Sequence, residues 1–256
     1  MTGLLRNEVA IFLLGVQFLT RLPIPSGVQF TPRRLSASVR YYPSIGLLIG
    51  AITAAVYWVF AIILPPALAV LISGAAGLLL TGAFHEDGLA DTFDGIGGSG
   101  DPKRALEIMK DSRIGTYGAA ALIMVLAIKM TALTLLPPPT VLIGLVVGHG
   151  LSRLSSVLVI ATSRYVRDQG TAKPTADGIG AVGLIIATLT GGIALLALAH
   201  VLTLVAALFA GVGLIAGHVL MRLFFEPKLG GYTGDTLGAV QQISEMGFYL
   251  GLLACL

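Results

Sequence analysis

The run from Ile179 to Phe225, IGAVGLIIATLTGGIALLALAHVLTLVAALFAGVGLIAGHVLMRLFF, decides the class of this protein. A bilayer has a hydrocarbon core of about 30 Å, which a helix of about 20 residues crosses. The run is too long for one such helix, and its only ionisable residue before His218 is His200. We therefore expect two spans here, at 179–199 and 201–221, which are joined at His200.

The rest of the chain has the same apolar character. Of its 256 residues 55% are apolar and only 11% are charged, which excludes an ordinary soluble domain. No long-period repeat or linker divides the chain. The expected fold is all-α: an integral membrane protein with about seven transmembrane helices, in which residues 1–256 form a single membrane-embedded catalytic domain. The five further spans are expected at 43–64, 67–84, 117–136, 141–162 and 237–256.

The first apolar segment, from Val9 to Leu19, predicts a helix of another kind. It ends in Thr20-Arg21-Leu22-Pro23 rather than in a small-residue cleavage site, so we do not expect a signal peptide. The segment is too short to cross a bilayer, and Gln17, Thr20 and Arg21 gather on one side of it. We therefore expect an N-terminal interfacial or re-entrant helix.

The connections between the spans alternate in charge. Fourteen of the 16 Lys and Arg residues lie in the N-terminal segment and three later connections, whereas the turns at Pro65, Pro138 and His200 hold no charged residue. The positive-inside rule then predicts a multi-pass protein of the cytoplasmic (inner) membrane, surrounded by membrane lipids, with its N-terminus inside. A net charge of only +3 is weak evidence for nucleic-acid binding, so we expect no nucleic-acid partner.

Three pairs of glycines have the small-xxx-small spacing that lets helices approach closely in lipid. They are Gly46/Gly50, Gly144/Gly148 and Gly213/Gly217. We interpret them as packing positions. The single cysteine, Cys255, excludes an internal disulfide, and the absence of CxxC and HxxxH patterns excludes a Cys/His zinc site. Any metal must therefore be held by oxygen ligands.

Acidic residues are concentrated after the second predicted span, where seven of the 13 fall within 26 positions. If that span continues as a helix, Asp87, Asp91 and Asp94 lie on one face with Glu86 beside them. Such close carboxylates repel, and a divalent cation would remove that cost. Because Mg²⁺ shares its shell with substrate phosphates, we predict a Mg²⁺ site for phosphate chemistry at Glu86, Asp87, Asp91 and Asp94. A solvated acidic loop is the alternative.

Two further segments supply candidate phosphate contacts. Lys110 and Arg113 follow a short helix that Asp101 caps, and either side chain would hold diphosphate oxygens. Ordinary positive-inside anchoring is the alternative. The glycine-rich stretch 230–238 would bring Thr233, Gly234 and Asp235 to a phosphate or metal, unless it is only a tight turn.

Arg153 stands near the middle of the span 141–162, with His149 one turn earlier on the same face. A charge at that depth faces the bundle interior or an anionic partner. We expect both side chains to meet a charged substrate, and the alternative is a structural pair between Arg153 and Glu245. Lys129 is expected to snorkel to the membrane surface without a role.

The motifs together resemble one known family. The runs Thr81-Gly82-Ala83-Phe84-His85-Glu86-Asp87-Gly88-Leu89-Ala90-Asp91-Thr92-Phe93-Asp94-Gly95 and Lys110-Asp111-Ser112-Arg113-Ile114-Gly115-Thr116-Tyr117-Gly118 are similar to those of the cobalamin synthase (adenosylcobinamide-GDP ribazoletransferase) family. Phe18 to Pro23, Tyr42-Pro43 and the loop Gly230 to Gly238 also fit, so the resemblance covers the whole chain. The acidic run is its most specific part.

The resemblance implies a Mg²⁺-dependent enzyme whose substrates are the corrinoid adenosylcobinamide-GDP and α-ribazole or its 5′-phosphate. A nucleoside hydroxyl would attack the phosphorus bound to cobinamide and expel GMP. Metal would stabilise the leaving group, Arg113 or Arg153 would add positive potential, and a carboxylate such as Asp94 would orient or deprotonate the hydroxyl. A homo-oligomer is compatible with the sequence.

Two other functions share part of this pattern. CDP-alcohol phosphotransferases begin their motif as Asp87-Gly88-Leu89-Ala90 does, but Asp91 stands where they have Arg and their later aspartates are absent. A cation-coupled transporter would place its carboxylates near the bilayer midplane, whereas this cluster is expected at a cytoplasmic edge.

Overall fold

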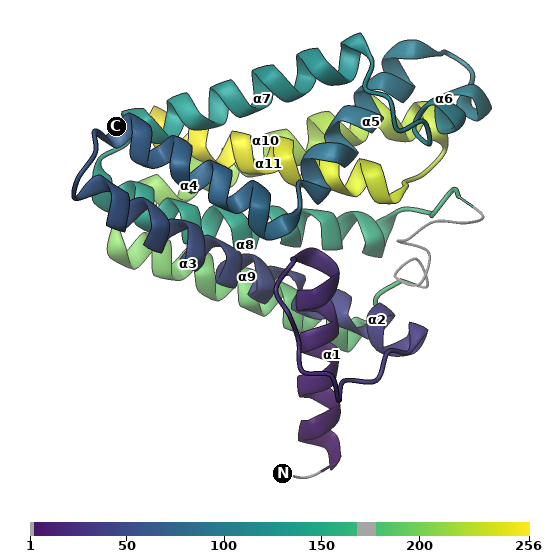
Figure 1. Ribbon diagram of the computed structural model, residues 1–256, viewed down its shortest axis with the longest axis horizontal. Coiled ribbons are helices and arrows are strands. Elements are labelled where there is room, and N and C mark those ends of the chain that lie inside the picture. The colour runs from purple at the N-terminus through teal and green to yellow at the C-terminus, as the bar shows by residue number, and fades with distance from the viewer. Residues whose placement is uncertain (1–2, 168–177) are drawn as a thin grey trace.

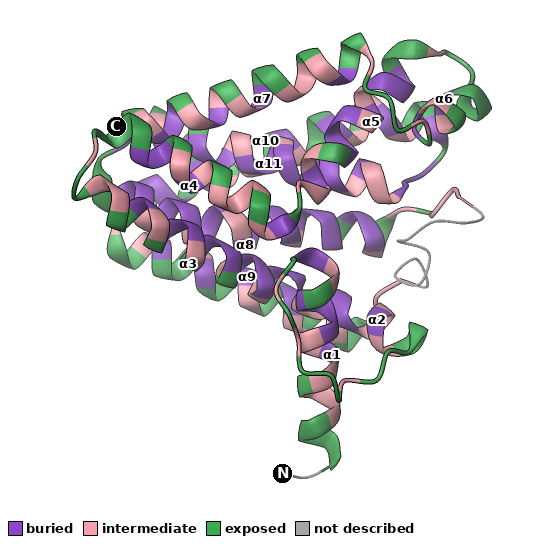
Figure 2. Cartoon of the chain, viewed as in Figure 1, coloured by how far each residue is buried: buried purple, intermediate pink, exposed green. Residues whose placement is uncertain are grey.

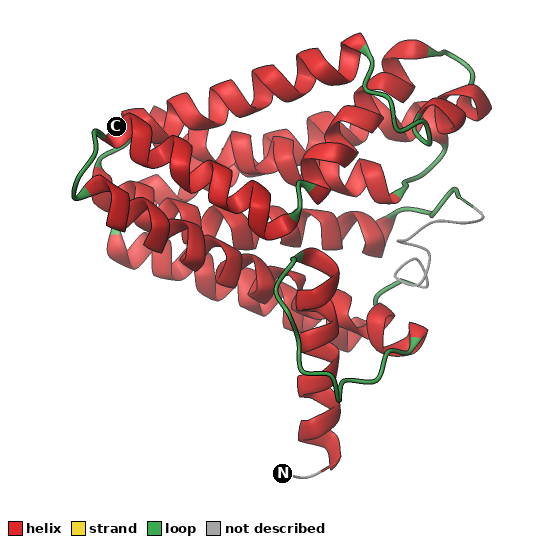
Figure 3. Cartoon of the chain, in the orientation of Figure 1, coloured by secondary structure: helices red, strands yellow, loops and turns green. Residues whose placement is uncertain are grey.

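The computed structural model describes residues 3–167 and 178–256, and within them every regular element is helical (Figures 1 and 3). The elements are α1 (Gly3–Leu19), α2 (Pro32–Ser38), the 3₁₀ turn η1 (Val39–Tyr41), α3 (Tyr42–Ala61), α4 (Pro66–Thr81), α5 (Phe84–Gly98), α6 (Pro102–Ile108), α7 (Thr116–Leu135), α8 (Pro138–Thr162), α9 (Ala181–Val201), α10 (Leu204–Leu229) and α11 (Gly234–Ala254). The predicted all-α fold is confirmed.

Within the described ranges, five helical segments are long and apolar enough to cross a membrane: Pro32–Ala61, which joins α2, η1 and α3, together with α7, α8, α9 and α10. A sixth is added if α4 and α5 count as one bent span. The predicted split at His200 is confirmed, because α9 ends at Val201 and α10 begins at Leu204. The predicted count of about seven is not confirmed, since α11 is not among these segments.

The long helices form a bundle along the longest axis of the molecule (Figure 1). The α3–α4 and α7–α8 connections and the C-terminus lie at one end, and α5 and α6 lie at the other. Figure 2 shows that burial is greatest in the middle of the bundle, along α8 and α11. Helix α11 packs against α10, α5, α8 and α7, so its polar residues face protein rather than lipid.

Helix α4 does not continue into the acidic run. It ends at Gly82, which has φ 66°, and Ala83 also has a positive φ of 55°. Two successive left-handed residues turn the chain by 87° between α4 and α5. The second predicted span thus does not continue as one helix, but the i, i+4 and i+7 spacing of Asp87, Asp91 and Asp94 holds within the separate helix α5.

The three glycine pairs lie at helix contacts, as predicted. A Cβ atom at Gly46 or Gly50 would collide with the backbone of α8, and one at Gly213 or Gly217 would collide with the backbone of α11. Gly144 and Gly148 face side chains of α11. Close helix approach without side chains is how helices pack in a bilayer, where the hydrophobic effect no longer drives their association.

Helix α1 projects away from the bundle, with the N-terminus at its far end (Figure 1). Its inner face buries Ile11, Leu14 and Leu19, whereas Leu4 and Leu5 are exposed. This amphipathic arrangement suits a helix lying at a membrane surface. Its interfacial placement stays a prediction.

Candidate active site

Two sequence motifs that lie about 150 positions apart meet where α5 crosses the start of α11. Gly88 of α5 packs on the backbone of Asp235, where an added Cβ would lie 2.7 Å from the carbonyl oxygen. Gly238 of α11 packs in the same way on the backbone of His85. Because neither glycine has a side chain, the acidic face of α5 comes directly beside the glycine-rich loop.

This contact creates a carboxylate face that comprises Asp87, Asp91 and Asp235. Asp91 feels the negative charges of both other members, and Asp235 also feels that of Asp87. Among the described residues, the cation that pairs with this face is Arg167, whose Nη2 lies 2.7 Å from Oδ2 of Asp235. The sequence did not single out Arg167, because it was one of several basic residues in a loop.

The two other predicted metal ligands are occupied by protein donors. Asp94 accepts hydrogen bonds from the backbone N–H groups of Gly115 at 2.7 Å and Gly118 at 2.8 Å, and so anchors the start of α7. Glu86 accepts a hydrogen bond of 2.8 Å from Nε2 of Gln242 through Oε1. In the part of the chain that the structure describes, no three acidic, His or Cys side chains form a ready-made metal site. Asp94 would have to exchange its backbone bonds to bind a metal.

Thr233 has a structural role at the start of α11. Its hydroxyl accepts a hydrogen bond from the N–H of Thr236, and the Thr236 hydroxyl accepts one from the N–H of Thr233. This reciprocal capping box orients the helix and places Asp235 in its first turn. Gly234 lines a small cavity that Arg153 also lines. Of the predicted loop residues, Asp235 is thus the one whose side chain joins the carboxylate face.

Lys110 and Arg113 are both exposed. Arg113 pairs with Asp111 at 2.6 Å, and the hydrogen bonds from Arg113 lower the pKa of the Asp111 carboxyl to about 2. Arg113 and Asp94 border the same open hollow at the α5–α6 end of the bundle, whereas Lys110 is outside its lining. Arg113 is therefore accessible to solvent, and its guanidinium is paired with the carboxylate of Asp111.

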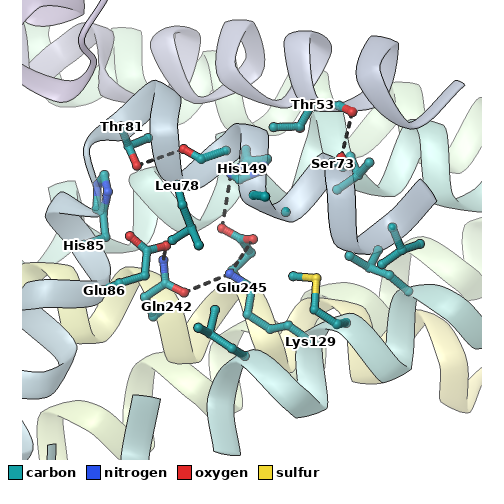
Figure 4. A pocket seen from close by; sticks show the side chains of 18 of the residues that line it. Thr53, Ser73, Leu78, Thr81, His85, Glu86, Lys129, His149, Gln242 and Glu245 are labelled. Carbon is teal, nitrogen blue, oxygen red and sulfur yellow. Dashed lines mark hydrogen bonds and ion pairs between the residues drawn. The ribbon is translucent and has the colours of Figure 1, made fainter. Parts of the chain in front are cut away.

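A separate polar network lies inside the bundle, between α7, α8 and α11 (Figure 4). Glu245 forms an ion pair of 2.8 Å with Lys129, and its other oxygen lies 3.3 Å from Nδ1 of His149. Lys129 also donates to Gln242 at 2.8 Å. The expectation that Lys129 snorkels was wrong, because its side chain is only 5% exposed and it pairs inside the protein. Gln242 and Glu245 were visible in the sequence as polar positions of an apolar segment, but their partner was not.

Arg153 is fully buried beside this network. It donates to the backbone oxygen of His149 at 3.0 Å, so the predicted neighbourhood of these two residues is confirmed. Among the described residues no carboxylate lies within ion-pair distance of its guanidinium, and the proposed structural pair with Glu245 is not formed. Its Nε atom is buried without a hydrogen-bond partner there.

The sequence model of the cobalamin-5-phosphate synthase family matches residues 11–253. The chain belongs to this family. The adenosylcobinamide-GDP ribazoletransferase of Shewanella frigidimarina is 44% identical over 253 residues, which cover 97% of this chain and 95% of the relative.

Other members of the cobalamin-5-phosphate synthase family agree. The proteins of the same name from Leptothrix cholodnii and Shewanella piezotolerans are 44% and 39% identical, and each alignment covers 97% of this chain and 96% of the relative. No solved structure matches the chain. The family resemblance found in the sequence motifs is confirmed, and the chain is an enzyme of the transferase class.

Proposed function

We propose that this chain transfers the cobinamide phosphate group of adenosylcobinamide-GDP to α-ribazole or its 5′-phosphate. A ribose hydroxyl forms a new bond to the phosphorus that carries cobinamide, the bond from that phosphorus to the bridging oxygen breaks, and GMP leaves with that oxygen. The hydroxyl proton goes to a base. The observation that carries this proposal is the meeting of Asp87 and Asp91 with Asp235 in a chain that matches the family almost from end to end.

The carboxylate face suits a magnesium ion that arrives with its substrate. Asp87, Asp91 and Asp235 offer only hard oxygen ligands, and in the described part of the chain Arg167 is the cation that pairs with these three carboxylates. Mg²⁺ in phosphate-handling sites is typically held by one or two carboxylates, with the remaining positions taken by water and phosphate. We propose Asp87 and Asp91 as its protein ligands, and when bound the ion would neutralise charge on the diphosphate.

The chain's own residues have distinct tasks in this proposal. A carboxylate of the face that does not hold the ion accepts the proton of the attacking hydroxyl. Arg167 moves from Asp235 to the substrate's phosphate oxygens, and Arg113 adds positive potential at the same end of the bundle. Lys110 remains a proposed diphosphate contact at that end.

A direct assay tests this function. Purified protein in detergent is incubated with adenosylcobinamide-GDP and α-ribazole, and the release of GMP and the corrinoid product are measured together. We expect both products in equal amounts and only with Mg²⁺. GMP release without corrinoid transfer would indicate a hydrolase, and transfer that survives chelation of divalent ions would refute the metal assignment.

We also propose that the carboxylate face opens to the cytoplasm. The connections between helices alternate between basic and uncharged, and the face lies on the side of the basic connections, which the positive-inside rule places in the cytoplasm. Single cysteines at Ser99 and at Pro138, in a Cys255→Ser background, report on this orientation. An impermeant maleimide added to intact cells should label the Pro138 position and spare the Ser99 position. The reverse pattern would invert the topology.

A further inference from the structure

A cavity of about 240 Å³ lies inside the bundle, beside the proposed active site (Figure 4). One part of its wall is apolar and comes from α4 and α7, with Val70, Leu78, Leu126, Met130 and Leu133. The rest of the lining includes polar residues, among them His85 and Glu86, the second and third residues of α5. The cavity therefore ends where the acidic run begins.

The polar wall is balanced in formal charge. Lys129 and Arg153 contribute two positive charges, and Glu86 and Glu245 contribute two negative charges. Lys129 and Glu245 already neutralise each other at 2.8 Å. A lining whose charged residues sum to no net charge and whose other residues are largely apolar does not favour a phosphate group. It favours an uncharged, flat and largely apolar group with a polar edge.

Two atoms of this wall have unused hydrogen-bonding capacity. Oε2 of Glu86 and Nε of Arg153 are buried without a hydrogen-bond partner among the described residues. Leaving such atoms unpaired costs free energy, so they mark a place where a ligand supplies the missing partners. The ligand would need a donor for Glu86 and an acceptor for Arg153.

The volume of the cavity further limits which ligand can bind there. An apolar cavity of about 150 Å³ is known to hold benzene, so 240 Å³ suits a bicyclic aromatic base. It is far too small for a corrin ring with its attached nucleotide. Adenosylcobinamide-GDP also carries bicyclic bases with acceptor ring nitrogens and ribose hydroxyls, but those purines bear polar exocyclic groups. The benzimidazole-type base of ribazole combines an acceptor ring nitrogen with an apolar edge, so it is the base that suits the apolar part of the lining.

We propose that this cavity is the acceptor subsite, where the benzimidazole-type base of ribazole lies against α4 and α7. The ring nitrogen accepts from Arg153, and a ribose hydroxyl donates to Glu86. Glu86 stands next to Asp87 in α5, so a nucleoside held in this way lies against the first turn of the helix that carries Asp87 and Asp91. This inference rests on the proposed function and adds where its second substrate binds.

Equilibrium binding of α-ribazole alone to the full chain in detergent tests this subsite. Leu78→Trp fills the cavity, whereas Leu79→Trp places the same side chain one position further along α4, where Leu79 is 78% exposed. We expect Leu78→Trp to weaken α-ribazole binding about tenfold or more, and Leu79→Trp to leave it nearly unchanged. The smaller riboside of unmethylated benzimidazole should lose less affinity in Leu78→Trp than α-ribazole does.

Equal affinities in the two variants would overturn the subsite, and so would an equal loss of affinity for adenosylcobinamide-GDP in Leu78→Trp. If Leu78→Trp does not fold, photolabelling of the wild-type protein with an azidobenzimidazole riboside decides. The subsite is supported if the label attaches to α4 or α7 and if excess α-ribazole prevents this labelling. Label attached elsewhere refutes the subsite.

The two proposals fail separately. Wild-type protein that binds α-ribazole in the cavity but releases no GMP refutes the proposed function alone. An active wild-type enzyme whose α-ribazole affinity survives Leu78→Trp refutes the subsite alone.

Discussion

Two groups of charged side chains lie at neighbouring levels of the bundle and are built differently. In the interior, Glu245 is matched by Lys129 and His149 and accepts a further hydrogen bond from Tyr249 at 3.1 Å. At the end of the bundle, residues 3–167 and 178–256 supply one ion pair to the carboxylate face of Asp87, Asp91 and Asp235, the pair between Arg167 and Asp235.

The difference follows from the cost of charge in an apolar medium. A charge that is buried for structural reasons is costly unless it is paired within the protein. A group of like charges at the end of the bundle persists only if something from outside completes it. Incomplete compensation thus distinguishes the proposed chemical site from the buried network.

The largest expected effect is on the buried network. Lys129→Met removes the partner of a carboxylate that is 2% exposed, and breaking such a pair typically costs about 3–5 kcal/mol. Unfolding in detergent, followed by circular dichroism, measures the loss. The double variant Lys129→Met/Glu245→Gln should recover most of it, because no unpaired charge is left. A stable Lys129→Met variant with impaired turnover would instead make this network part of the chemistry.

The carboxylate face should behave in the opposite way. We expect Asp87→Asn and Asp91→Asn each to lower kcat about 100-fold or more, because each removes a main electrostatic contributor, and to leave the protein folded. Initial rates of GMP release at saturating Mg²⁺ measure this. Asp101→Asn is the matched control, since Asp101 only caps α6 and Asn also caps helices. Normal turnover in both variants would remove the face from the mechanism.

Arg153 lies between the two regions. A variant at this position tests which of the two substrates the Arg153 side chain binds. We expect Arg153→Gln to raise the KM for α-ribazole about tenfold, equivalent to about 1.4 kcal/mol, with a smaller change in the KM for adenosylcobinamide-GDP. Steady-state kinetics with each substrate varied in turn separate the two effects. A rise confined to the GDP-linked substrate would restore the sequence-based hypothesis that Arg153 meets the phosphate.

The smallest effect is expected at Asp94, which the sequence placed in the metal site. Asp94→Asn keeps one side-chain oxygen for Gly115 or Gly118, so we expect a loss of about 1 kcal/mol in stability, comparable to a helix cap, and a nearly unchanged kcat. Thermal unfolding and GMP release on the same samples test this. A loss in kcat that matches those of Asp87→Asn and Asp91→Asn would return Asp94 to the metal site.

Much of the fold and part of the site could be predicted from the residues alone. The apolar segments became helices because a bilayer requires every backbone group to be bonded within the segment, and length and composition report this directly. The spacing of Asp87 and Asp91 survived because it is a local property of one helix, α5. Family membership was recognisable because the acidic run is continuous in sequence.

Tertiary structure decided which of these groups meet. The 87° turn at Gly82 and Ala83 moved α5 across the start of α11, and that crossing brought Asp235 to Asp87 and Asp91. The partner of Lys129 depends on which face of α11 packs toward α7. The helical periodicity of the sequence of either helix does not predict which face that is. A helical pattern specifies which residues share a face, whereas the neighbour of that face is set by the packing of helices that are distant in sequence.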